Sequence, residues 1–120
     1  MKIHGEEDIF VRNVFTLKSC APIVGSQVNC FDKEEKLLTA WRDFVLQVDP
    51  DVLTGYNIVN FDIPYIIERA EFLKISGYPK FTKLKDGISR IKSTTLSSKA
   101  LGTRDSKDIN MEGRIQFDML

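Results

Sequence analysis

Residues 55–65 read Gly55-Tyr56-Asn57-Ile58-Val59-Asn60-Phe61-Asp62-Ile63-Pro64-Tyr65, and this segment decides the fold. The run from Val52 to Asn57 begins with apolar and β-branched residues, which predicts a buried parallel strand that runs out into a loop. Pro64 then suits the first turn of a helix, where a missing amide costs nothing. The apolar residues that follow recur at helical spacing, at Ile63, Ile66, Ile67, Ala70 and Leu73. The segment therefore joins a strand to a helix.

Two strands and a helix are predicted upstream of this segment. Residues 11–17 are rich in β-branched and aromatic types, and residues 27–31 alternate polar with apolar. Asp32-Lys33-Glu34-Glu35 has the form of a capping box, with Asp32 as the N-cap. A helix should follow as far as Asp49-Pro50-Asp51. Its apolar face is formed by Leu37, Leu38, Trp41, Phe44, Val45 and Val48.

The downstream part is less regular. Residues 94–99 and 107–111 are predicted as strands around a loop that contains Gly102. A turn is expected at Glu112-Gly113, and residues 114–120 alternate again like a strand. With the upstream elements, this order predicts an α/β layer fold whose mixed sheet is flanked by helices.

Length and composition are those of an ordinary globular chain. Its 120 residues suit at most one domain, and 42% of them are hydrophobic. No apolar run approaches the roughly 20 residues that span a bilayer, and the N-terminus lacks the apolar core of a signal peptide. We therefore expect an intracellular protein without a membrane partner. Cys20 and Cys30 are expected to be reduced thiols.

Charge is distributed unevenly although the formal net charge is zero. Residues 74–107 carry nine Lys and Arg side chains against Asp86 and Asp105, an excess of seven positive charges. A stretch of this kind can follow a phosphate backbone. The alternative is a solvated loop region, which charge alone favours.

The polar residues of the 55–65 segment lie where a strand meets the N-terminus of a helix. Ligands of open α/β sheets bind beyond the carboxyl ends of the strands, so Asp62 is placed to hold a metal near a phosphate. Asp is also a preferred N-cap, and Asp62 could simply cap the helix. Asn57 could be a turn residue, and Phe61 could be a core aromatic. Tyr65 is expected to pack the helix onto the sheet.

Asn57-x-x-x-Phe61-Asp62, with Gly55-Tyr56 before it and Pro64-Tyr65 after it, resembles the second exonuclease motif of family B DNA polymerases. Further strings are similar to the delta-type enzymes of eukaryotes: Val14-Phe15-Thr16-Leu17-Lys18-Ser19-Cys20-Ala21-Pro22-Ile23, Asp49-Pro50-Asp51-Val52, Ser97-Ser98-Lys99-Ala100 and Gly113-Arg114. The resemblance implies a partial ribonuclease H-like (DnaQ-like) exonuclease fold without its first strand. Residues 9–120 would be the partial 3′–5′ exonuclease domain, and residues 1–8 a disordered tail.

The resemblance also implies a chemistry. Asp62 would be a catalytic metal ligand, and Asn57 and Phe61 would contact the substrate near its 3′ nucleotide. Two ions, Mg²⁺ or Mn²⁺, would hold the phosphate, activate a water and stabilise the leaving oxygen. The parent would be a nuclear DNA-directed DNA polymerase that removes mispaired 3′ nucleotides from single-stranded primer ends. Its implied partners are DNA, the rest of the polymerase chain, accessory subunits and the sliding clamp, and it would carry an iron–sulfur cluster outside this segment.

Two parts of the family's site are missing from these 120 residues. The family needs an Asp-x-Glu pair on the first strand, and the acidic run Glu6-Glu7-Asp8 has the wrong spacing in a polar tail. The family also needs a Tyr-x-x-x-Asp motif, which follows none of Tyr56, Tyr65 and Tyr78. We therefore expect an internal fragment that is inactive alone, with Asp118 in a structural role.

Two alternatives stay open at this stage. The chain could be a non-catalytic module for single-stranded nucleic acid, which would use the basic residues 74–107 and the Phe61 loop. It could also be a purely structural piece that binds neither metal nor DNA.

Overall fold

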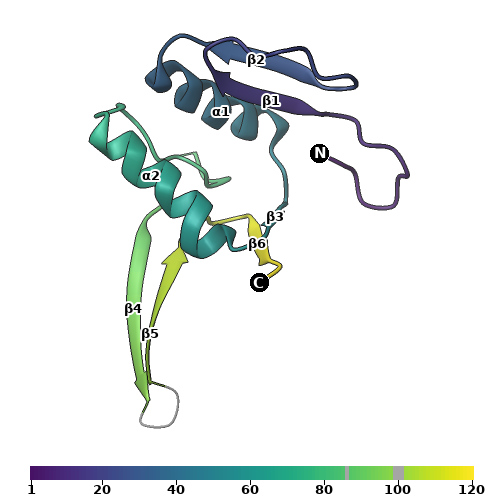
Figure 1. Cartoon of the computed structure of the whole chain (residues 1–120). Coiled ribbons are helices and arrows are strands. Elements are labelled where there is room, and N and C mark those ends of the chain that lie inside the picture. The colour runs from purple at the N-terminus through teal and green to yellow at the C-terminus, as the bar shows by residue number, and fades with distance from the viewer. Residues whose placement is uncertain (86, 99–101) are drawn as a thin grey trace. The chain divides into compact units, whose positions relative to one another are not determined.

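The computed structural model describes residues 1–85, 87–98 and 102–120, with the backbone alone for residues 93–98 and 102–107. The chain divides into two compact units, residues 1–41 and residues 42–120. Strands and helices occur in both parts of the sequence, which confirms the α/β class. Figure 1 shows these elements along the chain.

The first unit holds a parallel pair of short strands. Strand β1 (Asn13–Leu17) pairs with strand β2 (Gln27–Phe31), as residue types and alternation predicted. The rings of Phe15 and Phe31 are stacked, with centroids 6.2 Å apart and nearly parallel planes. An aromatic pair of this kind supports a ladder that has only two strands.

The predicted tail, residues 1–8, precedes this pair. Lys2 and Ile9 form an isolated antiparallel bridge, and the amino group of Met1 donates to the carbonyl of Val11. The expected disorder of this segment stays a prediction.

Helix α1 (Glu34–Val48) begins one position later than the capping box predicted. The amide of Leu37 donates to the carbonyl of Lys33 at 3.2 Å, so Lys33 is the residue that precedes the first helical turn. The carboxylate of Asp32 instead accepts a hydrogen bond from Lys36 Nζ at 3.2 Å. The interpretation of Asp32 as the N-cap was therefore wrong, because Lys33 occupies the position before the first turn.

The apolar face of α1 is as predicted at its centre. Leu38 and Val45 are buried, and Trp41 and Phe44 are half-buried. The helix ends at Val48, immediately before Asp49-Pro50-Asp51.

The second unit contains residues 55–65, the segment that joins a strand to a helix. Strand β3 (Val52–Gly55) leads into a π-helical turn, η1 (Ile58–Asp62), and then directly into helix α2 (Ile63–Phe72). Strand β6 (Ile115–Asp118) pairs parallel with β3. The strand-to-helix connection was predicted correctly, whereas the π-helical turn was not.

Strand β3 was predicted to be buried, and this was wrong. Val52 is 48% exposed, and Thr54 is exposed as well. In the described part of the chain, β3 pairs only with β6 and has no second neighbour to cover its other edge. Instead of one mixed sheet, the described strands form three two-stranded ladders, namely β1–β2, β3–β6 and β4–β5.

A long antiparallel hairpin lies between α2 and β6. It consists of β4 (Ile91–Ser98) and β5 (Gly102–Ile109), whose register pairs Ser98 with Gly102. Gly102 was predicted in a loop, but it lies at the start of β5, because the antiparallel ladder extends to it and pairs it with Ser98. Residues 99–101, and with them Lys99, lie outside the described residues. The predicted turn at Glu112-Gly113 is confirmed, and Gly113 has a φ of 86°.

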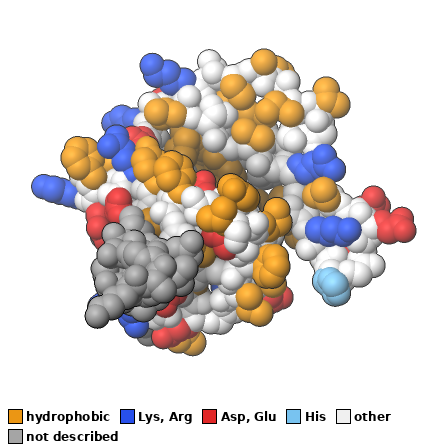
Figure 2. All heavy atoms as spheres, turned by 60° about the horizontal axis from the view of Figure 1, so that its bottom comes forward, with side chains coloured by type: hydrophobic (Ala, Val, Ile, Leu, Met, Phe, Trp, Pro, Cys, Tyr) orange, Lys and Arg blue, Asp and Glu red, His pale blue; other side chains and the backbone are white. Residues whose placement is uncertain are grey.

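The core of the second unit forms around the inner face of α2. Ile67 and Ala70 from this helix are buried, together with Phe81, Ile109 and Met111 from the segments that follow. Each fully buried large apolar side chain contributes about 1.5–3 kcal/mol. Other hydrophobic side chains stay at the surface, where Figure 2 shows them among charged ones. No helix in the described residues has the length and apolar character needed to cross a membrane.

Candidate functional site

The site begins at Asn57, where the chain passes from β3 into η1. This residue has φ 57° and ψ 28°, in the left-handed region that Asn tolerates better than most residues. Its carbonyl accepts the amide of Phe61 at 3.0 Å, and the amide of Ile63 reaches back to the carbonyl of Ile58. The turn is therefore one residue wider than an α-helical turn. Such π-helical turns are rare and occur frequently at functional sites.

Asp62 lies at the end of this turn with its carboxylate exposed. Its backbone is helical, with φ −64° and ψ −51°, and its side chain makes no capping hydrogen bond. A side-chain cap needs non-helical backbone angles at the cap residue, so the capping alternative for Asp62 was wrong. Within the described residues its carboxylate has no hydrogen-bond or ion-pair partner. Asp62 therefore offers two unoccupied carboxylate oxygens to a ligand.

Two aromatic side chains lie beside Asp62. Phe61 is 64% exposed and Tyr65 is 59% exposed, and their rings stack with centroids 6.4 Å apart at an angle of 8°. The interpretation of Phe61 as a core aromatic was wrong, and so was the expectation that Tyr65 packs against the sheet. Their positions on successive turns place both rings on the solvent side of the helix start.

Asn57 itself is held by its backbone more than by its side chain. Its left-handed conformation supports the alternative of a turn residue. Its side-chain oxygen accepts a hydrogen bond from Asn60 Nδ2 at 3.4 Å, which is long. Its contact with a substrate stays a prediction.

Asp118, at the end of β6, supports the turn from the neighbouring strand. Its Oδ1 accepts the amide of Asn57 at 2.6 Å, and its Oδ2 accepts the amide of Val59 at 3.0 Å. These bonds, the one from Val59 first, lower the pKa of Asp118 below its usual range. The predicted structural role is confirmed, although nothing in the sequence tied Asp118 to this turn.

Gly55 lets the turn approach the strand closely. A Cβ atom at this position would lie 2.3 Å from Cγ2 of Ile58. Real Cβ atoms do not make contacts this short, so a side chain at position 55 would displace the turn.

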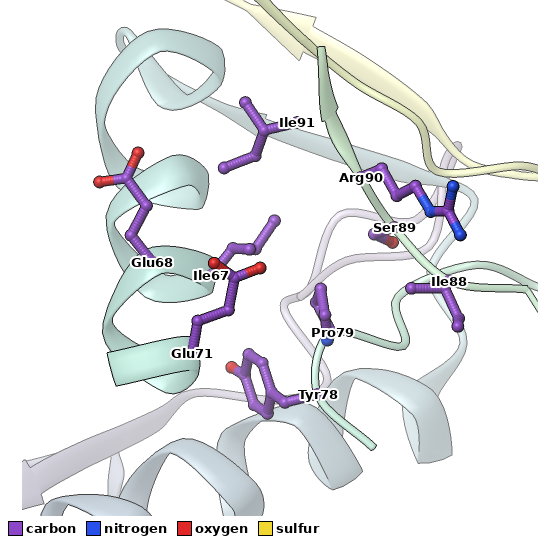
Figure 3. Close-up of a pocket in the computed structure, with 9 residues that line it drawn as sticks. All are labelled: Ile67, Glu68, Glu71, Tyr78, Pro79, Ile88, Ser89, Arg90 and Ile91. Carbon is purple, nitrogen blue, oxygen red and sulfur yellow. The ribbon is translucent and has the colours of Figure 1, made fainter. Parts of the chain in front are cut away.

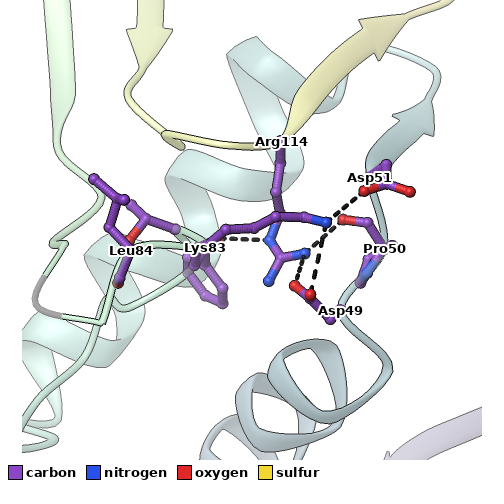
Figure 4. A network of polar contacts seen from close by, with 8 residues as sticks. Asp49, Pro50, Asp51, Lys83, Leu84 and Arg114 are labelled. Carbon is purple, nitrogen blue, oxygen red and sulfur yellow. Dashed lines mark hydrogen bonds and ion pairs between the residues drawn. The ribbon is translucent and has the colours of Figure 1, made fainter.

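A second polar cluster, drawn in Figure 4, is structural. Arg114 has a side chain that is 1% exposed, and it donates to the carbonyl of Phe81 at 2.7 Å. It also forms an ion pair with Asp49 at 2.8 Å. Lys83 pairs with Asp51 in the same cluster, and this hydrogen bond raises the pKa of Lys83. The cluster joins the C-terminal end of α1 to the starts of β3 and β6.

A cavity of about 630 Å³ lies between α2 and residues 78–79 and 88–91 (Figure 3). Its lining includes the apolar residues Ile67 and Pro79 and the exposed charged residues Glu71 and Arg90. The hydroxyl of Tyr78, another lining residue, is buried and has no hydrogen-bond partner among the described residues, and burial raises the pKa of this group. Neither Asp62 nor Phe61 lines this cavity.

The basic residues 74–107 are described only in part. Lys99 and the side chains of Arg104 and Lys107 lie outside the description. Lys83 is already engaged by Asp51 and Asp49, so its charge is compensated. The remaining exposed cations are Lys74, Lys80, Lys85, Arg90 and Lys92.

The residues described contain no group of three or more His, Cys, Asp or Glu side chains that could hold a metal ion. The structure thus brings Asn57, Phe61 and Asp62 together in one exposed turn, with Asp62 as a single carboxylate. Cys20 and Cys30 are both free thiols, as expected.

Comparison with known proteins gives a consistent result. All 120 residues match the family model described as DNA polymerase family B, exonuclease domain. The DNA polymerase delta catalytic subunits of Oryza sativa subsp. japonica and Dictyostelium discoideum are each 54% identical to the chain, over 118 and 120 residues. That of Drosophila melanogaster is 52% identical over 116 residues. These matches cover 98%, 100% and 97% of the chain, which spans only 11% of the length of each relative.

Proposed function

The chain belongs to the exonuclease-domain family of the family B DNA polymerases, and from this premise we propose that it forms part of the 3′–5′ proofreading exonuclease of a delta-type replicative polymerase. In this proposal the parent synthesises DNA and removes mispaired 3′ nucleotides. The finer fold is a partial ribonuclease H-like (DnaQ-like) domain over residues 9–120. The similarity to delta catalytic subunits along nearly the whole chain supports it.

The observation that carries the proposal is the exposed turn that ends in Asp62. Its carboxylate is not used for capping and is open to solvent. Such an oxygen donor suits Mg²⁺ or Mn²⁺. The exposed ring of Phe61 offers a face on which the terminal base can stack. We assign Asp62 as a metal-binding catalytic residue, and Phe61 and Asn57 as contacts to the 3′ nucleotide.

The residues present do not fit a complete two-metal site. Two divalent ions need several converging carboxylates, and Asp62 is the one carboxylate that the motif supplies. The 120 residues contain no Tyr-x-x-x-Asp motif, and their one Asp-x-Glu spacing, Asp32-Lys33-Glu34, lies at the start of α1 and not on a strand as the family requires. We therefore propose that this chain alone does not cleave DNA and that other segments of the parent complete the site.

The partners in this proposal follow from the parent enzyme. They are the single-stranded 3′ end of the primer, the rest of the polymerase chain, the accessory subunits and the sliding clamp. The parent would act in the nucleus and would carry its iron–sulfur cluster outside this segment.

The test uses a mismatched primer and Mg²⁺. The purified chain should leave the 3′ end intact, whereas the complete polymerase that carries this segment should trim it. In the complete enzyme Asp62→Ala should abolish trimming and spare synthesis, and Asp43→Ala on α1 is the control that should spare both. Trimming by the isolated chain that depends on Asp62 would contradict the inactivity.

A non-catalytic module for single-stranded DNA is the alternative, and the stacked pair of Phe61 and Tyr65 is the observation that favours it. Such a module should bind an oligonucleotide equally well in EDTA and in Mg²⁺, with a steep dependence on salt. If the chain is instead an exonuclease segment, Asp62→Ala should abolish nuclease activity in the complete polymerase, while weak binding of the oligonucleotide persists.

A further inference from the structure

We propose that Asp118 is a positioning residue for the Asp62 turn, because its carboxylate at the end of β6 accepts the first backbone amides of η1. This inference rests on the proposed function of Asp62. It assigns to a residue 56 positions downstream in the sequence the task of holding the turn that presents the metal-binding carboxylate.

The backbone amides at the start of η1 need acceptors from outside the turn. The first amides of any helix have no partner within the helix and need another acceptor. Asn57 is the cap residue of η1, and it makes no capping bond with its own side chain. Both oxygens of Asp118 fill this gap, with Oδ1 on the amide of Asn57 and Oδ2 on the amide of Val59. Val59 is the second residue of the turn, and its amide is one that an N-cap side chain ordinarily satisfies.

The register of β3 and β6 determines where Asp118 lies. Asp118 lies opposite Gly55 in the parallel ladder of β3 and β6, so both strands end at the same edge. The amide of Leu120 also donates to Oδ1 of Asp118, at 3.1 Å, which fixes the carboxylate from its own strand. The amide of Met119 donates to the carbonyl of Gly55 at 2.8 Å and closes the ladder beside it. The carboxylate is therefore held by the backbone that follows β6 as well as by the turn.

The negative charge of the Asp118 carboxylate strengthens its hydrogen bonds to the turn. An ionised carboxylate accepts stronger hydrogen bonds than a neutral group does, and negative charge is favoured at a helix start. Asp62 lies at the other end of the same turn, and its own side chain makes no capping bond. Asp118 holds the first amides of η1, so the turn is anchored without the Asp62 carboxylate, which stays open to a ligand.

The hydrogen bonds can be tested without any substitution. In the labelled 120-residue chain, NMR should detect scalar couplings across the hydrogen bonds from the amide nitrogens of Asn57 and Val59 to the carboxyl carbon of Asp118. Their absence at neutral pH would overturn the inference. This measurement decides the outcome even if every variant at position 118 fails to fold.

The effect on Asp62 is tested with Mn²⁺ as the probe. Mn²⁺ should broaden the amide signals of residues 61–63 in the wild-type chain. Asp118→Asn loosens the turn that carries Asp62 and should weaken this binding roughly tenfold, at the lower end of the loss that follows removal of residues that orient a metal ligand. The Asn side chain keeps one acceptor oxygen, so one of the two turn amides loses its bond. Asp43→Asn is the matched control on α1 and should leave the Mn²⁺ titration unchanged.

The two proposals fail in different ways. If Mn²⁺ does not broaden residues 61–63, or if Asp62→Asn leaves the broadening intact, the metal role of Asp62 is wrong. The couplings to Asp118 then still show whether that residue holds the turn. If the couplings are present but Asp118→Asn binds Mn²⁺ as the wild type does, the positioning of Asp62 by Asp118 is refuted and a purely structural cap remains.

Discussion

Gly55 is the residue at which the geometry of the site is most sensitive to a single methyl group. Its missing side chain allows Cγ2 of Ile58 to lie where a Cβ atom would be, at 2.3 Å. Ile58 is the first residue of η1, so any shift that relieves this contact moves the turn that carries Asp62. Strand and turn therefore fit together only with glycine at position 55.

We expect Gly55→Ala to lower the free energy of unfolding by about 1–3 kcal/mol, as overpacking typically does. Urea unfolding followed by circular dichroism measures this change. Ile58→Ala removes the atom that clashes, so the double variant should be more stable than the sum of the two single effects predicts. Strict additivity in this double-mutant cycle would show that the two side chains do not meet.

At the scale of elements, the start of α2 presents a surface built from two stacked rings. Phe61 and Tyr65 lie on successive turns and stay exposed, which leaves both rings available to a base. Phe72 lies at the other end of the same helix and is 73% exposed, with the Arg69 guanidinium 5.0 Å from its ring centroid. The helix thus offers a test residue and a control of the same chemical type.

We predict that Phe61→Ala weakens binding of a short single-stranded oligonucleotide by about 1–3 kcal/mol, the value of one base–aromatic stack. Tyr65→Ala should weaken binding by less, because Tyr65 supports the ring of Phe61 and lies farther from Asp62 along the chain. Fluorescence anisotropy with a labelled oligonucleotide gives both affinities. Phe72→Ala should bind like the wild type, and an equal loss in all three variants would mean that binding is not localised at the turn.

Some elements could be predicted from the sequence and others could not. Strands β1, β2 and β6 and helices α1 and α2 could be predicted because their signals are local, in alternation or helical spacing. The site motif could be found because its residues are contiguous. The π-helical turn and the role of Asp118 could not, since the bonds from Asn57 and Val59 to Asp118 link residues about 60 positions apart. The exposure of β3 depends on how many neighbours the strand has, which its own residues do not encode.

At the scale of the whole molecule, the two units differ in how they are held together. The first has the β1–β2 ladder, whereas the second has a buried core and the polar cluster of Arg114. Arg114 contacts two other segments of the second unit, one through Asp49 and Pro50 and one through Phe81. A buried guanidinium satisfied in this way fixes the relative position of those segments more than any surface ion pair can.

We therefore expect Arg114→Lys to destabilise the second unit by about 2–4 kcal/mol, because Lys cannot reproduce the fork of bonds and leaves buried carbonyls without a donor. Asp49→Asn should cost less, about 1 kcal/mol at most, since Asp49 is 53% exposed. Amide hydrogen exchange resolves the two units: protection should fall in β3 and β6 and persist in the β1–β2 ladder. A uniform loss of protection along the chain would show that the units unfold as one, and an effect of Asp49→Asn as large as that of Arg114→Lys would make the ion pair, and not the bonds to the carbonyls, the dominant contact.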